Sequence, residues 1–388
     1  MRSLPVRLGR QVVTRVRNQV AAPGFRRRAG QHGYLPQNAA ALFFATGPEN
    51  LYQFEQWRRP LEQLAERTPV FVIVDRPDTG DLILSTSSLP VTFARSSAQL
   101  EELVAERDVR VVLYCNQVEP NFRMLRFAAP VHVQIGHGES DKASSVSNQH
   151  KAYDLVFVAG EVASRRLGDA LRGFDPDSRT VSIGRPQLDH RYPGAPDWPR
   201  DSGRRILYAP TWEGDRPTIA YGSLASHGVP LVQALLAEPD VRVIYRPHPR
   251  TGTASPAAAA ADRRIRSLLG SPGGRHLVDR GDYGWQWDFA DVCITDISAV
   301  AYDWLATGKP LVVTEPVHRQ AVIPASPLLE RLPLLPAADA GRVGSWLARL
   351  DESRETLAEL SRLYFGDTAE HGSTRRFEAA VRAALDRT

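Results

Sequence analysis

One histidine stands where a proton-accepting group would be useful. His137 lies between Gly136 and Gly138 and follows the apolar run Val131–Ile135, which is typical of a buried strand. In parallel sheets, ligands bind at the carboxyl ends of the strands, and flanking glycines let a ligand or a second domain approach the backbone. An imidazole in that position can take a proton near neutral pH. The pattern indicates a general base, with a structural histidine as the alternative.

A second chemically active group follows the apolar run Val241–Tyr245. Two arginines and a histidine alternate there with prolines: Arg246, Pro247, His248, Pro249 and Arg250. Guanidinium and imidazole groups at a strand end can clamp an oxyanion. The alternative is a proline-stiffened basic turn. A further apolar run, Ile206–Ala209, ends in a group that offers an aromatic ring near the expected cleft: Tyr208, Pro210, Thr211 and Trp212.

The stretch from Ala290 to Pro310 predicts strand, capped helix and strand. Its apolar start is followed by residue types that cap a helix: Thr295, Asp296 and Ser298. The first amides of a helix have no intrahelical partner, so such an end favours anions, phosphate above all. Asp296 would repel phosphate, which indicates a structural role for it. An ordinary capped helix is the alternative for the whole stretch.

Several motifs that would indicate other kinds of catalysis are absent from the sequence. The sequence contains no Walker loop, GxGxxG fingerprint or GxSxG elbow, and no DxD or HExxH motif that would indicate a metal. We therefore expect neither a metal nor a resident cofactor. A histidine base, basic clamps and a helix start suit group transfer from a nucleotide diphosphate donor, with protein groups stabilising the leaving phosphate.

Length and composition indicate a two-domain globular chain. Its 388 residues exceed what one hydrophobic core usually serves, and no apolar run approaches the roughly 18 residues that cross a bilayer. Cys115 and Cys293 lie in apolar runs, so we expect no disulfide or cysteine zinc site, and a reducing cytoplasm suits them.

Strands alternate with helical patterns along most of the chain, which predicts parallel sheets covered on both faces. We expect a first Rossmann-like domain at 37–185, a linker rich in Pro, Asp and Gly at 186–203, a second Rossmann-like domain at 204–370 and a final helix at 371–388 that crosses back to the first. The expected strands of the first domain are Ala41–Ala45, Val70–Val74, Val109–Tyr114, Val131–Ile135 and Leu155–Val158.

The segment 1–36 is basic. Eight arginines precede Glu49, the first acidic residue, and apolar residues interleave with the arginines at helix-like spacing. A basic amphipathic segment suits the anionic inner face of a membrane. A solvated or disordered tail is the alternative. We expect no nucleic acid partner, because no aromatic stacking platform accompanies the arginines.

Several motifs, in their shared order, resemble the CDP-glycerol glycerophosphotransferase family of teichoic-acid synthesis. They are QIGHGESDK (134–142), YDLVFVAG (153–160), IGRPQLD (183–189), ILYAPTW (206–212), YRPHPR (245–250), ADVCITDISAVAYDWLATGKP (290–310) and HGSTRRF (371–377). The resemblance implies a GT-B architecture, two Rossmann-like domains facing a central cleft, and a cytoplasmic enzyme peripherally attached to the inner face of the membrane.

The resemblance also implies a mechanism and a site. His137 would deprotonate an acceptor hydroxyl, which attacks the β-phosphate of a CDP-alditol and releases CMP, with inversion at phosphorus and without a covalent intermediate. The acceptor would be lipid-linked or polymeric. His248 would act with the donor-binding residues Arg246, Arg250, Thr211, Thr295, Asp296, Ser298, Ala299 and Ser373. Gly138, Glu139 and Lys142 would lie on the acceptor side.

Three positions depart from the family pattern. Glu139 stands where a small hydroxyl residue is usual, Ile297 replaces an aromatic residue, and Ala299 replaces a second serine. Two further functions therefore remain open: a GT-B glycosyltransferase that uses a nucleotide sugar, and a catalytically inert member that binds glycan or nucleotide.

Overall fold

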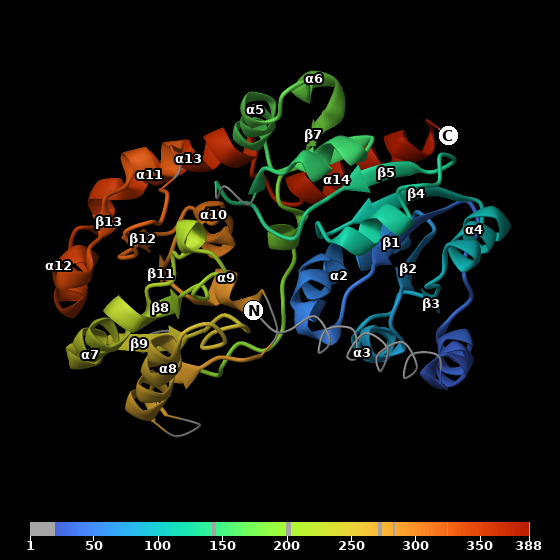
Figure 1. Cartoon of the computed structure of the whole chain (residues 1–388). Coiled ribbons are helices and arrows are strands. Elements are labelled where there is room, and N and C mark those ends of the chain that lie inside the picture. Colours follow the sequence, from blue (N-terminus) through green and yellow to red (C-terminus); the bar gives the residue numbers. More distant parts are fainter. Residues whose placement is uncertain are drawn as a thin grey trace.

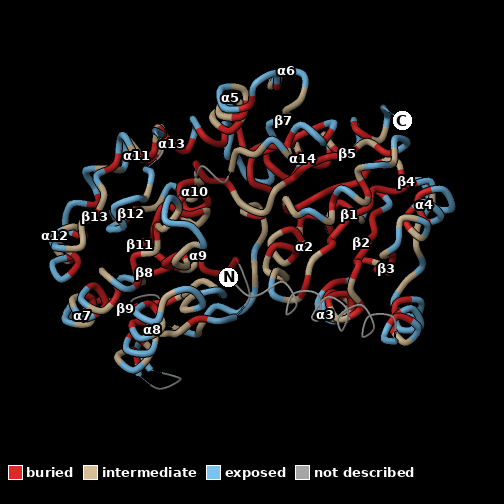
Figure 2. The backbone as a smooth tube through the Cα atoms, viewed as in Figure 1, coloured by how far each residue is buried: buried red, intermediate tan, exposed pale blue. Residues whose placement is uncertain are grey.

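The computed structural model describes residues 20–141, 145–198, 203–270, 274–281, 284–323 and 325–387. These residues form two lobes, each built on one parallel sheet with helices on both faces (Figure 1). In both lobes the strands are buried and the outward faces of the covering helices are exposed (Figure 2). This arrangement confirms the predicted α/β architecture.

The sheet of the first lobe has seven strands in the order β3-β2-β1-β4-β5-β6-β7. Its strands are β1 (Ala39–Phe44), β2 (Val70–Val74), β3 (Val91–Phe93), β4 (Val109–Tyr114), β5 (Val131–Gln134), β6 (Leu155–Val158) and β7 (Thr180–Ser182). Its helices are α2 (Leu51–Ala65), α3 (Pro77–Thr86), α4 (Ser97–Glu106), α5 (Glu161–Ala170) and α6 (Pro176–Arg179).

The sheet of the second lobe has six strands in the order β10-β9-β8-β11-β12-β13. Its strands are β8 (Arg204–Ala209), β9 (Val241–Tyr245), β10 (Leu277–Val278), β11 (Val292–Thr295), β12 (Leu311–Thr314) and β13 (Leu334–Leu335). The helices that follow the linker are α7 (Val229–Ala237), α8 (Pro256–Leu269), α9 (Trp285–Phe289), α10 (Ala299–Leu305), α11 (Pro327–Arg331), α12 (Val343–Leu347), α13 (Arg354–Phe365) and α14 (Gly372–Leu385).

The strand orders locate the two places where a ligand is expected. In the first sheet the order reverses between β1 and β4, and in the second between β8 and β11. Open parallel sheets bind ligands outside the carboxyl ends of the strands at such switch points. Thr211 follows β8, and the segment from Asp296 to Ser298 follows β11. The topology therefore brings two sequence-predicted groups to one point.

Three short strands, β3, β7 and β13, escape the sequence pattern. Each lies at the edge of its sheet, is two or three residues long and is only partly buried. An edge strand needs no continuous apolar run, because one side faces solvent or a covering loop. The buried strands, by contrast, match the predicted ranges to within two residues at either end.

Helix α14 belongs to the first lobe although it closes the chain. Its residues Phe377, Val381 and Ala384 are fully buried in the core of the first sheet, and Figure 1 shows the helix lying over that sheet. Trp57 of α2 packs against Phe377 with a ring separation of 5.1 Å. The predicted crossing of the terminal helix is therefore confirmed.

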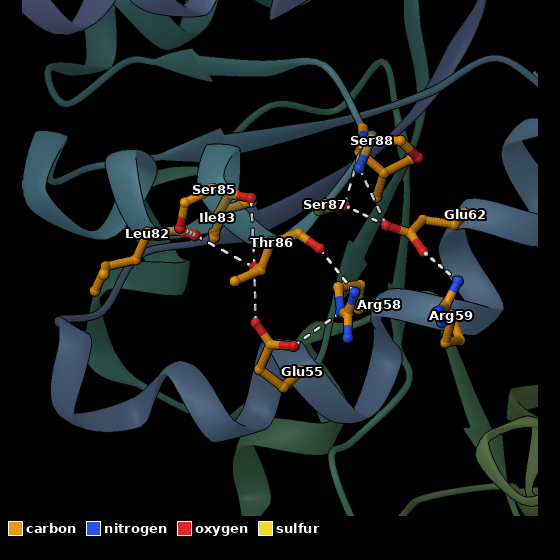
Figure 3. Close-up of polar contacts among 11 residues, drawn as sticks. Glu55, Arg58, Arg59, Glu62, Leu82, Ile83, Ser85, Thr86, Ser87 and Ser88 are labelled. Carbon is orange, nitrogen blue, oxygen red and sulfur yellow. Dashed lines mark hydrogen bonds and ion pairs between the residues drawn. The ribbon is translucent and has the colours of Figure 1, made fainter. Parts of the chain in front are cut away.

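Polar contacts fasten helix α2 to the end of α3 (Figure 3). Thr86 donates to Glu55 at 2.9 Å, and Arg58 donates to the Thr86 carbonyl at 2.7 Å. One turn further, Glu62 accepts from the Ser87 hydroxyl at 2.9 Å and from the Ser88 amide at 3.1 Å. These bonds fix the position of α2 relative to the sheet. That position matters because α2 reaches the cleft between the lobes.

Part of the basic N-terminal segment is folded. Residues 20–32 are helical, and Ala22, Phe25 and Ala29 are buried in the core of the first lobe. Arg26 and Arg27 on the opposite side are exposed. Residues 1–19, which carry most of the predicted amphipathic pattern, lie outside the described part of the chain. Within the described ranges, no helix has the length and apolar character that crossing a bilayer requires.

The buried phenyl ring of Phe25 predicts that this helix stabilises the first lobe. A Cβ added at Gly80 would lie 2.4 Å from the ring, which shows how closely α3 packs on it. Phe25→Ala is expected to lower the free energy of unfolding by about 3–5 kcal/mol, as the loss of a buried phenyl ring usually does. Urea titration measures the change. Arg27→Ala on the exposed face is the control, and equal losses in both variants would contradict the packing.

Candidate active site

One cavity of about 1280 Å³ lies between the two lobes. From the first lobe it is lined by residues of α2 and of the β4 and β5 ends, among them Tyr52, Asn116, Gln134, His137, Gly138 and Glu139. From the second lobe it is lined by Thr211, Trp212, Arg246, His248, Ser298 and Ala299. The structure thus brings together most of the residues that the sequence singled out.

The backbone before His137 is held from α2. Gly136 has a φ of 60°, a conformation that glycine adopts without strain, and the indole of Trp57 donates to its carbonyl. Nδ1 of His137 lies 3.3 Å from the carbonyl oxygen of Cys115. Because a carbonyl only accepts, Nδ1 carries the hydrogen in this contact, and Nε2 of the neutral ring is the basic nitrogen.

Tyr52 of α2 lies between the two predicted histidines. Its ring centroid is 5.9 Å from that of His137 and 5.7 Å from that of His248, with interplanar angles of 87° and 73°. His137 belongs to the first lobe and His248 to the second. The imidazoles therefore flank one phenol ring inside the shared cavity.

The arginines of the basic loop point in different directions. Arg246 lines the cavity and forms an ion pair of 2.5 Å with Asp279. Arg250 is exposed, and its guanidinium lies 3.6 Å from the centroid of Trp212. The ring of His248 also stacks on Trp212, with the two ring centroids 6.4 Å apart. The structure therefore places Arg246 at the cavity wall and Arg250 over the indole, so that only one of the two predicted clamp arginines lines the cavity.

The predicted helix start divides into a cavity-facing part and a buried part. Ser298 caps α10, and Ser298 and Ala299 line the cavity. Thr295 is fully buried and donates to the Ala209 carbonyl at 2.7 Å. Contact of Thr295 with a donor is thus excluded in this arrangement, because its hydroxyl is enclosed by protein.

Asp296 is a buried structural centre. Its carboxylate accepts from the amides of Thr211 at 2.7 Å and Ser223 at 3.2 Å, and from the Thr314 hydroxyl at 2.6 Å. Burial raises the pKa of the carboxyl, and these hydrogen bonds oppose that effect. Asp296 therefore ties together the ends of β8, β11 and β12 and does not line the cavity, which corrects its place among the predicted donor-binding residues.

The lobes approach each other closely at His137. A Cβ added at Gly138 would lie 2.7 Å from the Cβ of Ala299, too close for real atoms. A glycine at 138 and a small residue at 299 therefore suit each other. The predicted reason for the glycine, close approach of a second domain, is what the structure shows.

A buried ion pair joins the lobes beside this contact. Arg185, at the end of the first lobe, donates from Nε and Nη2 to both carboxylate oxygens of Asp303 on α10, at 2.8 and 3.2 Å. The two side chains are only 7% and 3% exposed. Ser298 and Asp303 belong to the same short helical segment, so this pair sets the position of the α10 start relative to His137.

Glu139, the unusual neighbour of His137, is paired. Arg166 of α5 forms ion pairs with both Glu139 and Asp141, and Tyr364 of α13 donates to Asp141. The two carboxylates raise the pKa of Arg166, although burial alone would lower it. Glu139 thus faces a guanidinium and is not a free carboxylate beside the imidazole.

Besides Arg250, Thr295 and Asp296, a further predicted residue does not line the cavity. Ser373 is buried on α14 and packs against Gly184, where a Cβ would lie 2.2 Å from its hydroxyl. The hydroxyl accepts from Arg376, so its role is to fasten the terminal helix. Lys142, predicted on the acceptor side, lies outside the described residues.

The sequence reading missed the residues that position the site: Tyr52, Trp57, Arg166, Arg185 and Asp303. Four of them lie within the helices α2, α5 and α10, and only Arg185, which follows β7, stands near the carboxyl end of a strand. Trp57 and Tyr52 share α2 but are five residues apart, a spacing that does not place them on one helix face and so gives no periodic signal. The ion pair Arg185–Asp303 joins residues far apart in the chain and has no local signal.

The two-lobed architecture and the interlobe cavity define a GT-B-type fold. Residues 127–316 match the model of the CDP-glycerol:poly(glycerophosphate) glycerophosphotransferase family. This match confirms the resemblance to that family that the motifs predicted. The match runs from just before β5 to just after β12, and so covers both histidine motifs and the α10 start. No curated protein sequence matches the chain.

Solved structures support the fold. The wall teichoic acid polymerase TagF superposes with a TM-score of 0.59 at 14% identity, covering 99% of each chain. A putative UDP-N-acetylglucosamine 2-epimerase from Listeria monocytogenes has a TM-score of 0.61 at 14% identity, covering 91% of this chain and 98% of its own. The UDP-GlcNAc 2-epimerase from Neisseria meningitidis, bound to UDP-GlcNAc, reaches 0.57 at 12% identity, with 89% and 100% covered. All three share the two-lobed architecture.

The buried ion pair between the lobes generates a test. Arg185→Met leaves the carboxylate of Asp303 buried without its guanidinium, and this is expected to cost about 3–5 kcal/mol of unfolding free energy. Urea titration of the single variant and of Arg185→Met/Asp303→Leu measures the effect, and the double variant should recover most of the loss.

The control is the half-exposed pair Arg28–Asp81, where Arg28→Ala should change stability by at most about 1 kcal/mol. A double variant as unstable as Arg185→Met would show that the charge of Asp303 is not what destabilises the single variant.

Proposed function

We propose that the enzyme transfers glycerol phosphate, or a related alditol phosphate, from a CDP-activated donor to a hydroxyl group of a lipid-linked or polymeric acceptor. The observation that carries the proposal is the shared cavity: His137 lines it from one lobe, and Arg246, His248 and the α10 start line it from the other. A base and an anion-binding wall thus face the same space. The family match supports the donor class.

In the proposed reaction, Nε2 of His137 takes the proton of the acceptor hydroxyl. The oxygen attacks the β-phosphorus, which carries the alditol, and the bond between that phosphorus and the bridging oxygen breaks. CMP leaves with the electron pair. Arg246, His248 and the amides at Ser298 and Ala299 stabilise the charge that develops on the phosphates. The proposal requires no cofactor besides the donor.

Two other functions remain as outcomes of the test. A TagF variant has been solved after soaking with CDPG, and the epimerase from Neisseria meningitidis bound to UDP-GlcNAc, so the fold alone does not decide between the two kinds of nucleotide. The inert alternative rested on Glu139 and Ala299. Its support is weaker, because Arg166 pairs with Glu139 and Ala299 fits against Gly138.

Removal of the His137 imidazole tests its proposed role as the base. His137→Ala is expected to lower CMP release from CDP-glycerol by about 100- to 10,000-fold, the usual contribution of a general base, with unchanged circular dichroism and melting temperature. His318→Ala, at an exposed position outside the cavity, is the matched control. Full turnover in His137→Ala would reject the base assignment.

A panel of nucleotide donors tests the substrate class, with melting temperature and turnover as the two measurements. CDP-glycerol should raise the melting temperature, because a ligand that binds the native and not the unfolded state stabilises the native state by RT ln(1 + [L]/Kd). UDP- and GDP-sugars at equal concentration should raise it less. Transfer from a UDP- or GDP-sugar without use of any CDP-alditol would establish the glycosyltransferase alternative, and binding without turnover of any donor would establish the inert one.

We also propose that the basic N-terminal segment attaches the enzyme to the anionic inner face of the membrane, which would place it in the cytoplasm. The exposed Arg26 and Arg27 support this, since cationic side chains near a surface are attracted to anionic lipids.

Deleting residues 1–19 and changing Arg26 and Arg27 to Gln is expected to reduce sedimentation with phosphatidylglycerol vesicles. The core residue Phe25 is kept so that the lobe stays folded. Phosphatidylcholine vesicles are the control, and unchanged binding to the anionic vesicles would exclude this mode of attachment.

A further inference from the structure

Tyr52 stands outside every motif of the family resemblance, yet it contacts both histidines of the proposed reaction. Its ring lies edge-to-face at 5.9 Å from His137 and at 5.7 Å from His248. The first histidine follows β5 in one lobe and the second follows β9 in the other. Tyr52 therefore connects, through one ring, two side chains that no common secondary-structure element positions.

The ring is held from its own helix. Gln53 donates from Nε2 to the Tyr52 hydroxyl at 3.3 Å and accepts from Asn116 Nδ2 at 3.1 Å. Gln53 and Asn116 are buried, and Asn116 follows the end of β4. The bonds of α2 to the end of α3 fix the helix itself (Figure 3). The phenol is thus anchored to the first lobe before it meets His248.

The Tyr52 phenol can orient a neighbouring imidazole without adding a charge to the site. Burial raises the pKa of the Tyr52 phenol, while the Gln53 hydrogen bond and the charge of Arg250 oppose the rise, so the group is neutral at pH 7. Edge-to-face aromatic pairs have a preferred geometry and contribute beyond the area that they bury. A neutral ring in such contacts restrains an imidazole and adds no charge to the site.

We propose that Tyr52 is a positioning residue that sets the orientation of His137 and His248 toward each other across the cleft, through its ring and not through its hydroxyl. The assignment of a reaction step to the two histidines rests on the proposed function, but the contact with both rings does not. Tyr52 acts on the reaction through the imidazoles.

A spectroscopic experiment tests the contact. In ¹H–¹³C spectra of the imidazole groups, assigned with His137→Ala and His248→Ala, Tyr52→Leu should shift the resonances of both histidines, because the ring current of the phenol is lost. Tyr52→Phe should leave both near their original positions. Tyr34→Leu is the matched control, since Tyr34 is exposed and contacts Arg107 far from the cavity. Unmoved histidine resonances in Tyr52→Leu would overturn the proposal.

Kinetics test the role. Tyr52→Leu should lower kcat for CDP-glycerol about tenfold, the size expected when two aromatic contacts are lost in the transition state, with KM for CDP-glycerol within twofold. Tyr52→Phe should keep most of the turnover. An equal loss in Tyr52→Phe would assign the role to the hydroxyl and overturn the proposal.

The proposed function and the positioning role of Tyr52 can fail independently of each other. If the native enzyme does not turn over CDP-glycerol, the proposed function fails, and the imidazole spectra still decide whether Tyr52 contacts both histidines. If turnover is normal and Tyr52→Leu keeps the native kcat, the positioning role fails while the proposed function stands.

Discussion

The buried ion pair between Arg185 and Asp303 is the constraint on which the site depends. It joins the end of one lobe to the helix whose start faces the cavity in the other, with both side chains almost fully enclosed. A buried pair of this kind is far more sensitive to the loss of one partner than an exposed one. Because Asp303 follows Ser298 at the start of α10, the pair fixes the position of this cavity-lining helix start relative to His137.

Around this pair the two lobes contribute different chemistry. The first supplies the imidazole of His137, its backbone held by Trp57 and its ring beside Tyr52. The second supplies Arg246, His248 and the α10 start. Beneath that wall, Asp296 draws three strand ends together through hydrogen bonds to backbone and hydroxyl groups. A carboxylate that would repel phosphate at the surface thus serves as a buried acceptor.

The departures from the family pattern acquire physical reasons in the tertiary structure. Glu139, two residues after His137, is paired with Arg166, which also pairs with Asp141 and so draws the loop after β5 toward α5. The Cβ of Ala299 leaves no room for a side chain at position 138. Both substitutions concern how the lobes and loops fit, and neither removes the imidazole or the cationic side chains from the cavity.

The sequence by itself determined the parallel α/β architecture and the positions of the buried strands along the chain. It also placed His137, His248 and Ser298 after strand ends. Apolar runs, glycines and capping residues are local signals, which is why a single sequence reveals them. Only the tertiary structure decided which of these side chains share a cavity. It enclosed Asp296 and Thr295, turned Arg250 onto Trp212, and brought in Tyr52 and the pair Arg185–Asp303. Contacts between residues far apart in the chain depend on how sheets and helices pack, and a single sequence carries no local mark of them.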